Sequence, residues 1–112
     1  MLPKISVQLP NHGEVESALV TILRTRGNRP LRASEAYRVL AEHFQLDWKQ
    51  LNVKTATRDE LKWHNVCRTA RNNLVKKGVV NRLPYNSWTL TDYGVRQFEK
   101  PIQTELSVEE LI

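Results

Sequence analysis

The hydrophobic period of the chain changes at Gly78, and this change limits the folds open to the sequence. Before Gly78, apolar residues recur every three or four positions, so at about 100° per residue they share one helix face. These residues are Trp63, Val66, Cys67, Ala70 and Leu74. After Gly78, β-branched and aromatic residues flank the turn sequence Pro84–Ser87, which is typical of a β-hairpin. The sequence therefore predicts a long amphipathic helix that ends at a glycine and leads into a hairpin.

Four helices are expected, and each follows a residue whose side chain can accept a hydrogen bond from the free N–H groups of a helix. These capping residues are Asn11, Ser34, Thr57 and Thr91. A glutamate stands three positions after Asn11 and after Thr57, which completes a capping box in both cases. We expect helices over about 14–25, from Ser34 through Phe44, over about 59–77, and from Thr91 to Pro101.

The segments between these helices complete the predicted topology. Pro30–Arg32 reads as a short extended piece that adds a third strand to the sheet of the hairpin. Residues 46–54 are expected to form a short helical turn or an ordered loop in which Trp48 and Leu51 pack. The order is then helix, short strand, helix, helix, hairpin, helix. This order predicts a mostly helical α+β fold, the winged helix-turn-helix, whose hairpin of two or three strands is the wing.

One domain is expected, because 112 residues leave little room for a second. We place an N-terminal arm at residues 1–12, the domain at 13–100, and an acidic tail or linker at 101–112. The formal charge of +5 favours a polyanionic partner, and its distribution is informative. Between Leu61 and Thr91 there are six lysines or arginines and no Asp or Glu, whereas the charged residues after 98 are four glutamates and one lysine.

Two segments resemble a known family. Residues 74–80 read LVKKGVV and residues 86–94 read NSWTLTDYG. Together they resemble the end of the N-terminal domain of Mrr-type restriction endonucleases, and the similarity extends over about residues 2–98. One departure is Thr69 before Ala70, where that family often has Trp-Ala. The resemblance implies a winged helix that recognises DNA, either as a stand-alone protein or as part of a longer chain with a separate nuclease domain.

The residues expected to contact double-stranded DNA come from three places. A winged helix sets its third helix in the major groove, so the polar face of that helix should meet base edges. This face carries Asn65, Arg68, Thr69, Asn72 and Lys76. Phosphate contacts are expected from Arg71 and Lys77 beside this face, and from Arg32 and Ser34 at the start of the second helix. Arg82 on the wing should reach the backbone or the minor groove.

The sequence gives no sign of chemistry beyond binding. We find no catalytic constellation and no metal-ligand or cofactor motif, so we expect neither an enzyme, a metal site nor a cofactor. With one cysteine and no long apolar run, a cytoplasmic protein without membrane contact is expected. Cys67 is expected to be buried and inert, His43 and His64 to be surface or capping residues, and all three tryptophans to be core residues.

Two other functions stay open at this stage. The first is a small transcriptional repressor, which would usually act as a dimer, and the sequence does not fix the oligomeric state. The second is a winged helix that serves protein–protein assembly and binds no nucleic acid. The run of positive charge without acidic residues favours DNA recognition, and the resemblance implies that the domain is the targeting part of a restriction-type system.

Overall fold

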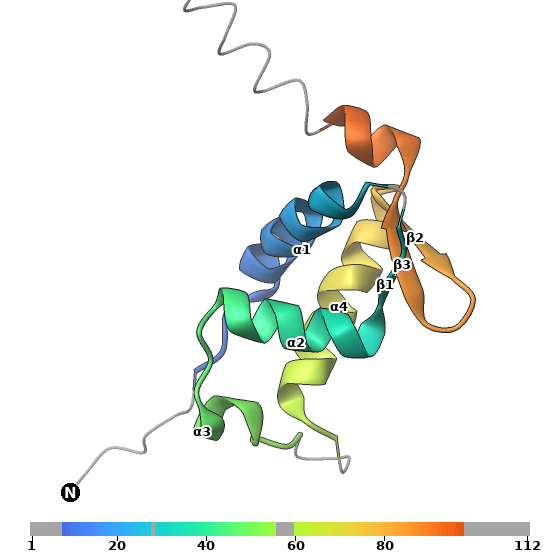
Figure 1. Cartoon of the computed structure of the whole chain (residues 1–112). Helices are drawn as coiled ribbons and strands as arrows, with labels where there is room; N and C mark the ends of the chain where they lie inside the picture. Colours follow the sequence, from blue (N-terminus) through green and yellow to red (C-terminus); the bar gives the residue numbers. More distant parts are fainter. Residues whose placement is uncertain (1–7, 28, 56–59, 98–112) are drawn as a thin grey trace, which may run out of the picture.

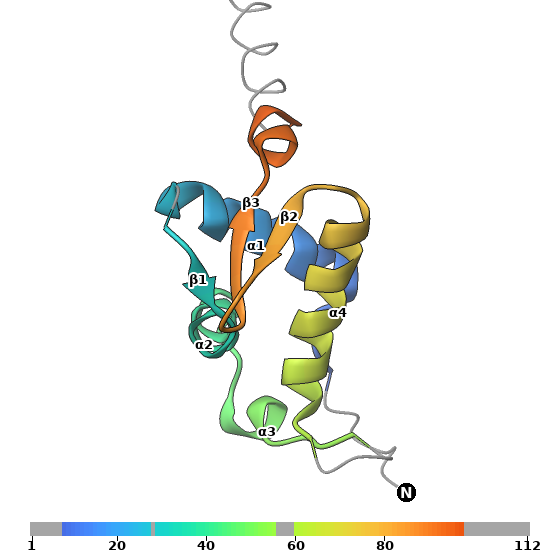
Figure 2. The same cartoon turned by 90° about the vertical axis from the view of Figure 1, so that its right-hand side faces the viewer.

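The computed structural model describes residues 8–27, 29–55 and 60–97, and these form a mainly helical α+β fold (Figure 1). Its elements are α1 (His12–Arg26), β1 (Leu31–Arg32), α2 (Ala33–His43), α3 (Trp48–Leu51), α4 (Lys62–Lys76), β2 (Val80–Leu83) and β3 (Ser87–Leu90). Residues 92–97 are also helical. In Figures 1 and 2, α3 lies at one end of the molecule and residues 92–97 at the other.

The sheet has three short antiparallel strands in the order β1-β3-β2. Leu31 of β1 and Arg82 of β2 both pair with Trp88 of β3. Because directly paired residues project from the same face, these three side chains share one face of the sheet. The predicted third strand before the second helix is therefore confirmed, and so is the predicted hairpin.

The core lies where α1, α2 and α4 meet the inner face of the sheet. All five apolar residues of the predicted long-helix face are buried in it, and Trp63 and Trp88 are among its largest side chains. Packing of these two rings fixes the helices against the sheet, since large aromatic side chains contribute much of the apolar area that a small domain buries. No helix within the described part of the chain is long and apolar enough to cross a membrane.

Trp48 corrects one core prediction. The expected short helical turn exists as α3, but the Trp48 side chain is 73% exposed and only Leu51 packs against the core. A capping box between Asp47 and Gln50 sets the orientation of this single turn, and the Gln50 side chain also donates to the Gln8 carbonyl at 2.8 Å. Positions three apart share one helix face, so the helical period of this single turn does not account for the exposure of Trp48.

The start of α4 was also predicted wrongly. The helix begins at Lys62, three residues after the expected start, and its N-cap Leu61 makes no capping bond with its side chain. The backbone before α4 is instead extended, with a β-bridge between Lys54 and Leu61 and a 2.7 Å hydrogen bond from Lys62 N to the Val53 carbonyl. This pairing with the connector replaces the expected capping box. Thr57 lies outside the described residues.

The starts of α1 and α2 are capped in different ways, α1 by neighbouring residues and α2 by a residue distant in sequence. At α1 the predicted box is confirmed, with Glu14 N donating to Asn11 Oδ1 at 2.8 Å and Asn11 N to Glu14 Oε1 at 3.0 Å. At α2 the predicted cap Ser34 is wrong, because it lies inside the helix and the N-cap is Arg32, which makes no side-chain capping bond. Ala33 N donates instead to the Asn86 carbonyl at 2.7 Å, so the hairpin caps α2.

Thr91 starts the last helix as predicted. Its hydroxyl accepts from Gly94 N at 2.8 Å and donates to the Gly78 carbonyl at 2.6 Å. Tyr93 and Val95 of this helix are exposed. This helix leaves the end of the sheet (Figure 1), and its Tyr93 and Gln97 line a groove together with residues of α1 and α4. Phe98, Pro101 and the predicted tail lie outside the described residues.

Candidate nucleic-acid interface

The polar face of α4 lies opposite the core, as its period requires. Asn72 and Lys76 are exposed on it, while Asn65 and Thr69 are partly buried. Side chains four positions apart on a helix are neighbours, so these residues form a row along its axis. The row contains amides, a hydroxyl and an ammonium group, which are the donors and acceptors that can read base edges. Four of the five residues expected on this face thus lie together on one surface.

Arg68, the fifth residue, lies at the edge of this face that is nearer to α2. Its Nη2 atom donates to Oε2 of Glu60, which stands two residues before α4. This hydrogen bond raises the pKa of Arg68 above its ordinary value. Arg68 therefore keeps its charge, but a carboxylate already neutralises it. The sequence offered no reason to pair these residues once Glu60 had been assigned to a capping box.

Arg71 differs most from its expected place. It is only 6% exposed, and its guanidinium lies over the Trp88 ring at 5.1 Å from the centroid. Nε donates to Asn72 Oδ1 at 2.7 Å. Burial lowers the pKa of Arg71, and the charges of Arg82 and Arg68 lower it further. Among the described residues no carboxylate pairs with Arg71.

The hairpin carries Arg82 next to this buried cation. Arg82 is exposed and shares its sheet face with Trp88, over which Arg71 lies. The charges of Arg68 and Arg82 thus both act on the Arg71 guanidinium where α4 meets the hairpin, and these three side chains form one set. We call this set the arginine cluster. Like charges repel, so the cluster favours an anion beside it.

The tip of the hairpin lies next to the start of α2. Tyr85 and Asn86 have left-handed backbone angles, with φ of 64° and 53°, and the Tyr85 side chain is 89% exposed. The bond from Ala33 N to the Asn86 carbonyl ties this tip to α2, where Arg32 and Ser34 are exposed. Figure 2 shows the hairpin, the start of α2 and α4 together, with α1 behind them.

Lys77 does not belong to this side. Its Nζ atom contacts Glu16 Oε1 of α1 at 2.8 Å, and Asn73 donates to the other carboxylate oxygen at 2.9 Å. Burial alone would raise the pKa of Glu16, but the bonds from Lys77 and Asn73 outweigh it and lower the pKa. Lys77 therefore joins α4 to α1, and the predicted phosphate contact has no support from its position.

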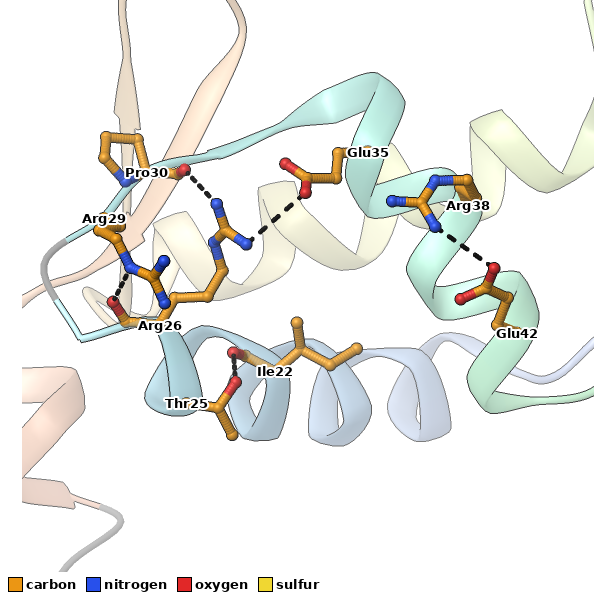
Figure 3. Close-up of polar contacts among 8 residues, drawn as sticks. All are labelled: Ile22, Thr25, Arg26, Arg29, Pro30, Glu35, Arg38 and Glu42. Atoms are coloured by element: carbon orange, nitrogen blue, oxygen red, sulfur yellow. Dashed lines mark hydrogen bonds and ion pairs between the residues drawn. The ribbon is translucent and has the colours of Figure 1, made fainter.

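The arginines of the first loop also serve the fold. Arg26 donates to the Pro30 carbonyl at 3.0 Å and lies 3.6 Å from a carboxylate oxygen of Glu35, as Figure 3 shows. Arg29 donates to the Arg26 carbonyl at 3.3 Å. These contacts fix the turn that joins α1 to β1 and bring Arg32 to the start of α2.

An aromatic pair beside α4 was not expected from the sequence. The rings of Tyr37 and His64 stack with centroids 4.1 Å apart, at the rim of a groove of about 590 Å³ between α2, α3 and α4. Burial lowers the pKa of His64, and the charge of Arg68 lowers it further. The stacking joins residues 27 positions apart, and no local pattern indicates it.

Cys67 is fully buried, and burial raises the pKa of its thiol to about 12, so it is unreactive as expected. Within residues 8–27, 29–55 and 60–97, no three His, Cys, Asp or Glu residues gather as metal ligands. Comparison of the chain with protein-family models, curated proteins and solved structures found no match.

Proposed function

We propose that this chain is a winged-helix domain that binds double-stranded DNA, with α4 in the major groove and the β2–β3 hairpin as the wing. The order of its helices and strands supports this fold, because a short strand, a helix pair and a hairpin follow α1 as in winged helices. Asn65, Thr69, Asn72 and Lys76 would then face base edges, and Arg32 and Ser34 would approach the backbone.

The arginine cluster is the observation that carries this proposal. Arg71 is buried without a carboxylate partner among the described residues, and the charge of the exposed Arg82 acts on it, whereas Arg68 is already paired with Glu60. A buried charge is costly unless it is paired, and a guanidinium matches the geometry of a phosphate. The cluster also opens beside the polar face of α4 and the exposed hairpin. A DNA phosphate at the junction of helix and wing supplies the missing anion.

The resemblance of residues 74–80 and 86–94 to Mrr-type restriction endonucleases supports a narrower role. We propose that the domain selects DNA targets in a restriction-type system. The structure gives a physical reason for part of that pattern. Thr91 links Gly78 to Gly94 through its hydroxyl, and this link sets the hairpin between α4 and the last helix.

The test is binding to a random-sequence duplex of about 30 base pairs while NaCl is varied between about 50 and 200 mM. Log affinity should fall linearly with log salt concentration, because each neutralised phosphate releases about one counterion. Replacing Arg82 by alanine should weaken binding and reduce the slope by about 0.9. The matched control is Arg24→Ala, an exposed arginine of α1, which should leave the slope unchanged.

Equal losses in the two variants would show that only total charge matters and would contradict the proposed interface. No binding by the wild-type chain even at low salt would contradict DNA recognition itself. Exposed Trp48 would then favour the assembly function, because large exposed aromatic side chains are enriched in protein–protein contacts.

A further inference from the structure

The ion pair between Arg68 and Glu60 joins a residue of the proposed DNA interface to the connector before α4. The two side chains are 34% and 19% exposed, so the pair is partly shielded from water. Both residues neighbour the Tyr37–His64 stack, since their charges act on the His64 imidazole. This contact opposes binding to a polyanion, because it sets a negative charge against a cation that a phosphate would otherwise attract.

The backbone of the connector holds Glu60 in this place. Thr55 N donates to the Glu60 carbonyl at 2.9 Å, and the bridge between Lys54 and Leu61 fixes the next residue. Lys62 N then donates to the Val53 carbonyl. Hydrogen bonds at the Glu60 carbonyl and at the two residues that follow it thus position Glu60, and its carboxylate is a built part of the surface.

We propose that Glu60 determines the specificity of the DNA interface, an inference that rests on the proposed function. Attraction to phosphate depends on net charge, and the net charge of the Arg68–Glu60 pair is zero. Base reading depends on directed hydrogen bonds, and a guanidinium has five N–H donors, more than its bonds to Glu60 and to the Tyr37 hydroxyl use. Glu60 thus suppresses binding of Arg68 to any backbone and leaves donors that can reach the O6 and N7 atoms of a guanine.

The first experiment compares Glu60→Gln with Glu42→Gln on the random-sequence duplex. Glu42 is the matched control, because it is also paired with an arginine, Arg38, and its loss changes the net charge equally. Glu60→Gln should bind more tightly than Glu42→Gln, and its salt slope should be steeper by about 0.9, the value of one added phosphate contact. Thermal melting of each variant checks that it is folded.

The second experiment uses Glu60→Gln combined with Arg68→Gln, which replaces the pair by two amides without changing the net charge. Its affinity and salt slope on the random-sequence duplex should equal those of the wild type. Its affinity should fall on a duplex enriched by the wild-type chain from a random pool, because the base contact is lost. This comparison of the double variant with the wild type tests the proposal even if Glu60→Gln alone fails to fold.

The outcomes separate the two proposals. If the wild type binds duplex DNA but Glu60→Gln behaves like Glu42→Gln, the role of Glu60 is wrong and the proposed function stands. If the double variant loses affinity equally on both duplexes, the role of Glu60 is again wrong and the proposed function stands, since Arg68 would then be a general phosphate contact. If the wild type binds no duplex, both proposals fail together.

Discussion

Arg71 and Arg68 show how single side chains change character when the chain folds. Both lie on the basic part of the sequence and were expected to be free for DNA. One is buried over Trp88, and the other is paired with Glu60. A guanidinium can stack on an aromatic ring and donate hydrogen bonds in its plane at the same time, which suits Arg71 to a junction between helix and hairpin.

His64 gives a prediction at this scale. Burial and Arg68 lower its pKa below the ordinary value of 6.5, so the folded state resists protonation. The unfolded chain binds more protons in the window below about 6.5, and the free energy of unfolding therefore falls as the pH falls through it. His64→Gln should show a weaker decline than the wild type in urea denaturation between about pH 7.5 and pH 5.

His43→Gln is the matched control, because His43 is exposed at the end of α2. It should keep the wild-type decline. An unchanged decline in His64→Gln would show that its protonation is not coupled to folding.

At the scale of elements, the residues after α4, the end of β3 and the start of the last helix meet at one carbonyl group, that of Val79. Thr91 N and the Thr91 hydroxyl both reach the Val79 carbonyl, and Gly94 packs against that same group. Local propensity alone does not bring a strand end, a helix end and a new helix start to one point. The glycine is needed there because no side chain fits.

Gly94→Ala tests this contact. An added Cβ would lie 2.4 Å from the Val79 carbonyl oxygen and 3.1 Å from Val79 Cγ1, so the backbone has to move. We expect the free energy of unfolding to fall by about 1–3 kcal/mol, measured by urea denaturation.

Gly13→Ala is its control, since that Cβ would meet only Asn11 Oδ1 at 3.4 Å within helix α1. There the better helix propensity of alanine should keep or raise stability, by up to about 1 kcal/mol. A loss in Gly13→Ala as large as that in Gly94→Ala would contradict the steric explanation.

At the scale of the whole molecule, two adjacent lysines face different sides. Lys76 is exposed on the polar face of α4, whereas Lys77 contacts Glu16 of α1. Lys76→Ala should therefore weaken duplex binding and reduce the salt slope by about 0.9, and Lys77→Ala should change the slope little. Each substitution removes one positive charge from one helix end, so each is the control for the other.

Lys77→Ala should instead lower the free energy of unfolding by less than about 1 kcal/mol, because the lysine end of the pair is exposed. Because the pKa of Glu16 is lowered in the folded state, its ionised carboxylate stabilises the fold at any pH above the ordinary pKa of 4.5. That contribution is lost as the pH falls through the pKa of the folded state. Lys77→Ala should thus also reduce the acid dependence of stability. A lower salt slope in Lys77→Ala would contradict this assignment.

The sequence by itself determined the features that neighbouring residues decide. The apolar face of α4, the hairpin after Gly78, the capping box at Asn11 and the Thr91 cap follow from helix and strand periods and from side chains that reach their own backbone. These contacts form within a few residues, so their patterns are readable along the chain. The polar row on α4 belongs to the same class, since it is the opposite of the buried face.

Only the tertiary structure decided which of the polar residues are free. Arg71 meets Trp88, Lys77 meets Glu16, and the hairpin rather than Ser34 caps α2, all through partners distant in sequence. Trp48 is exposed although it shares a helix face with Leu51, so the helical period of α3 did not decide its burial. A charged or aromatic side chain is suited to several environments, and its partner is set by which elements pack together, so local sequence does not fix it.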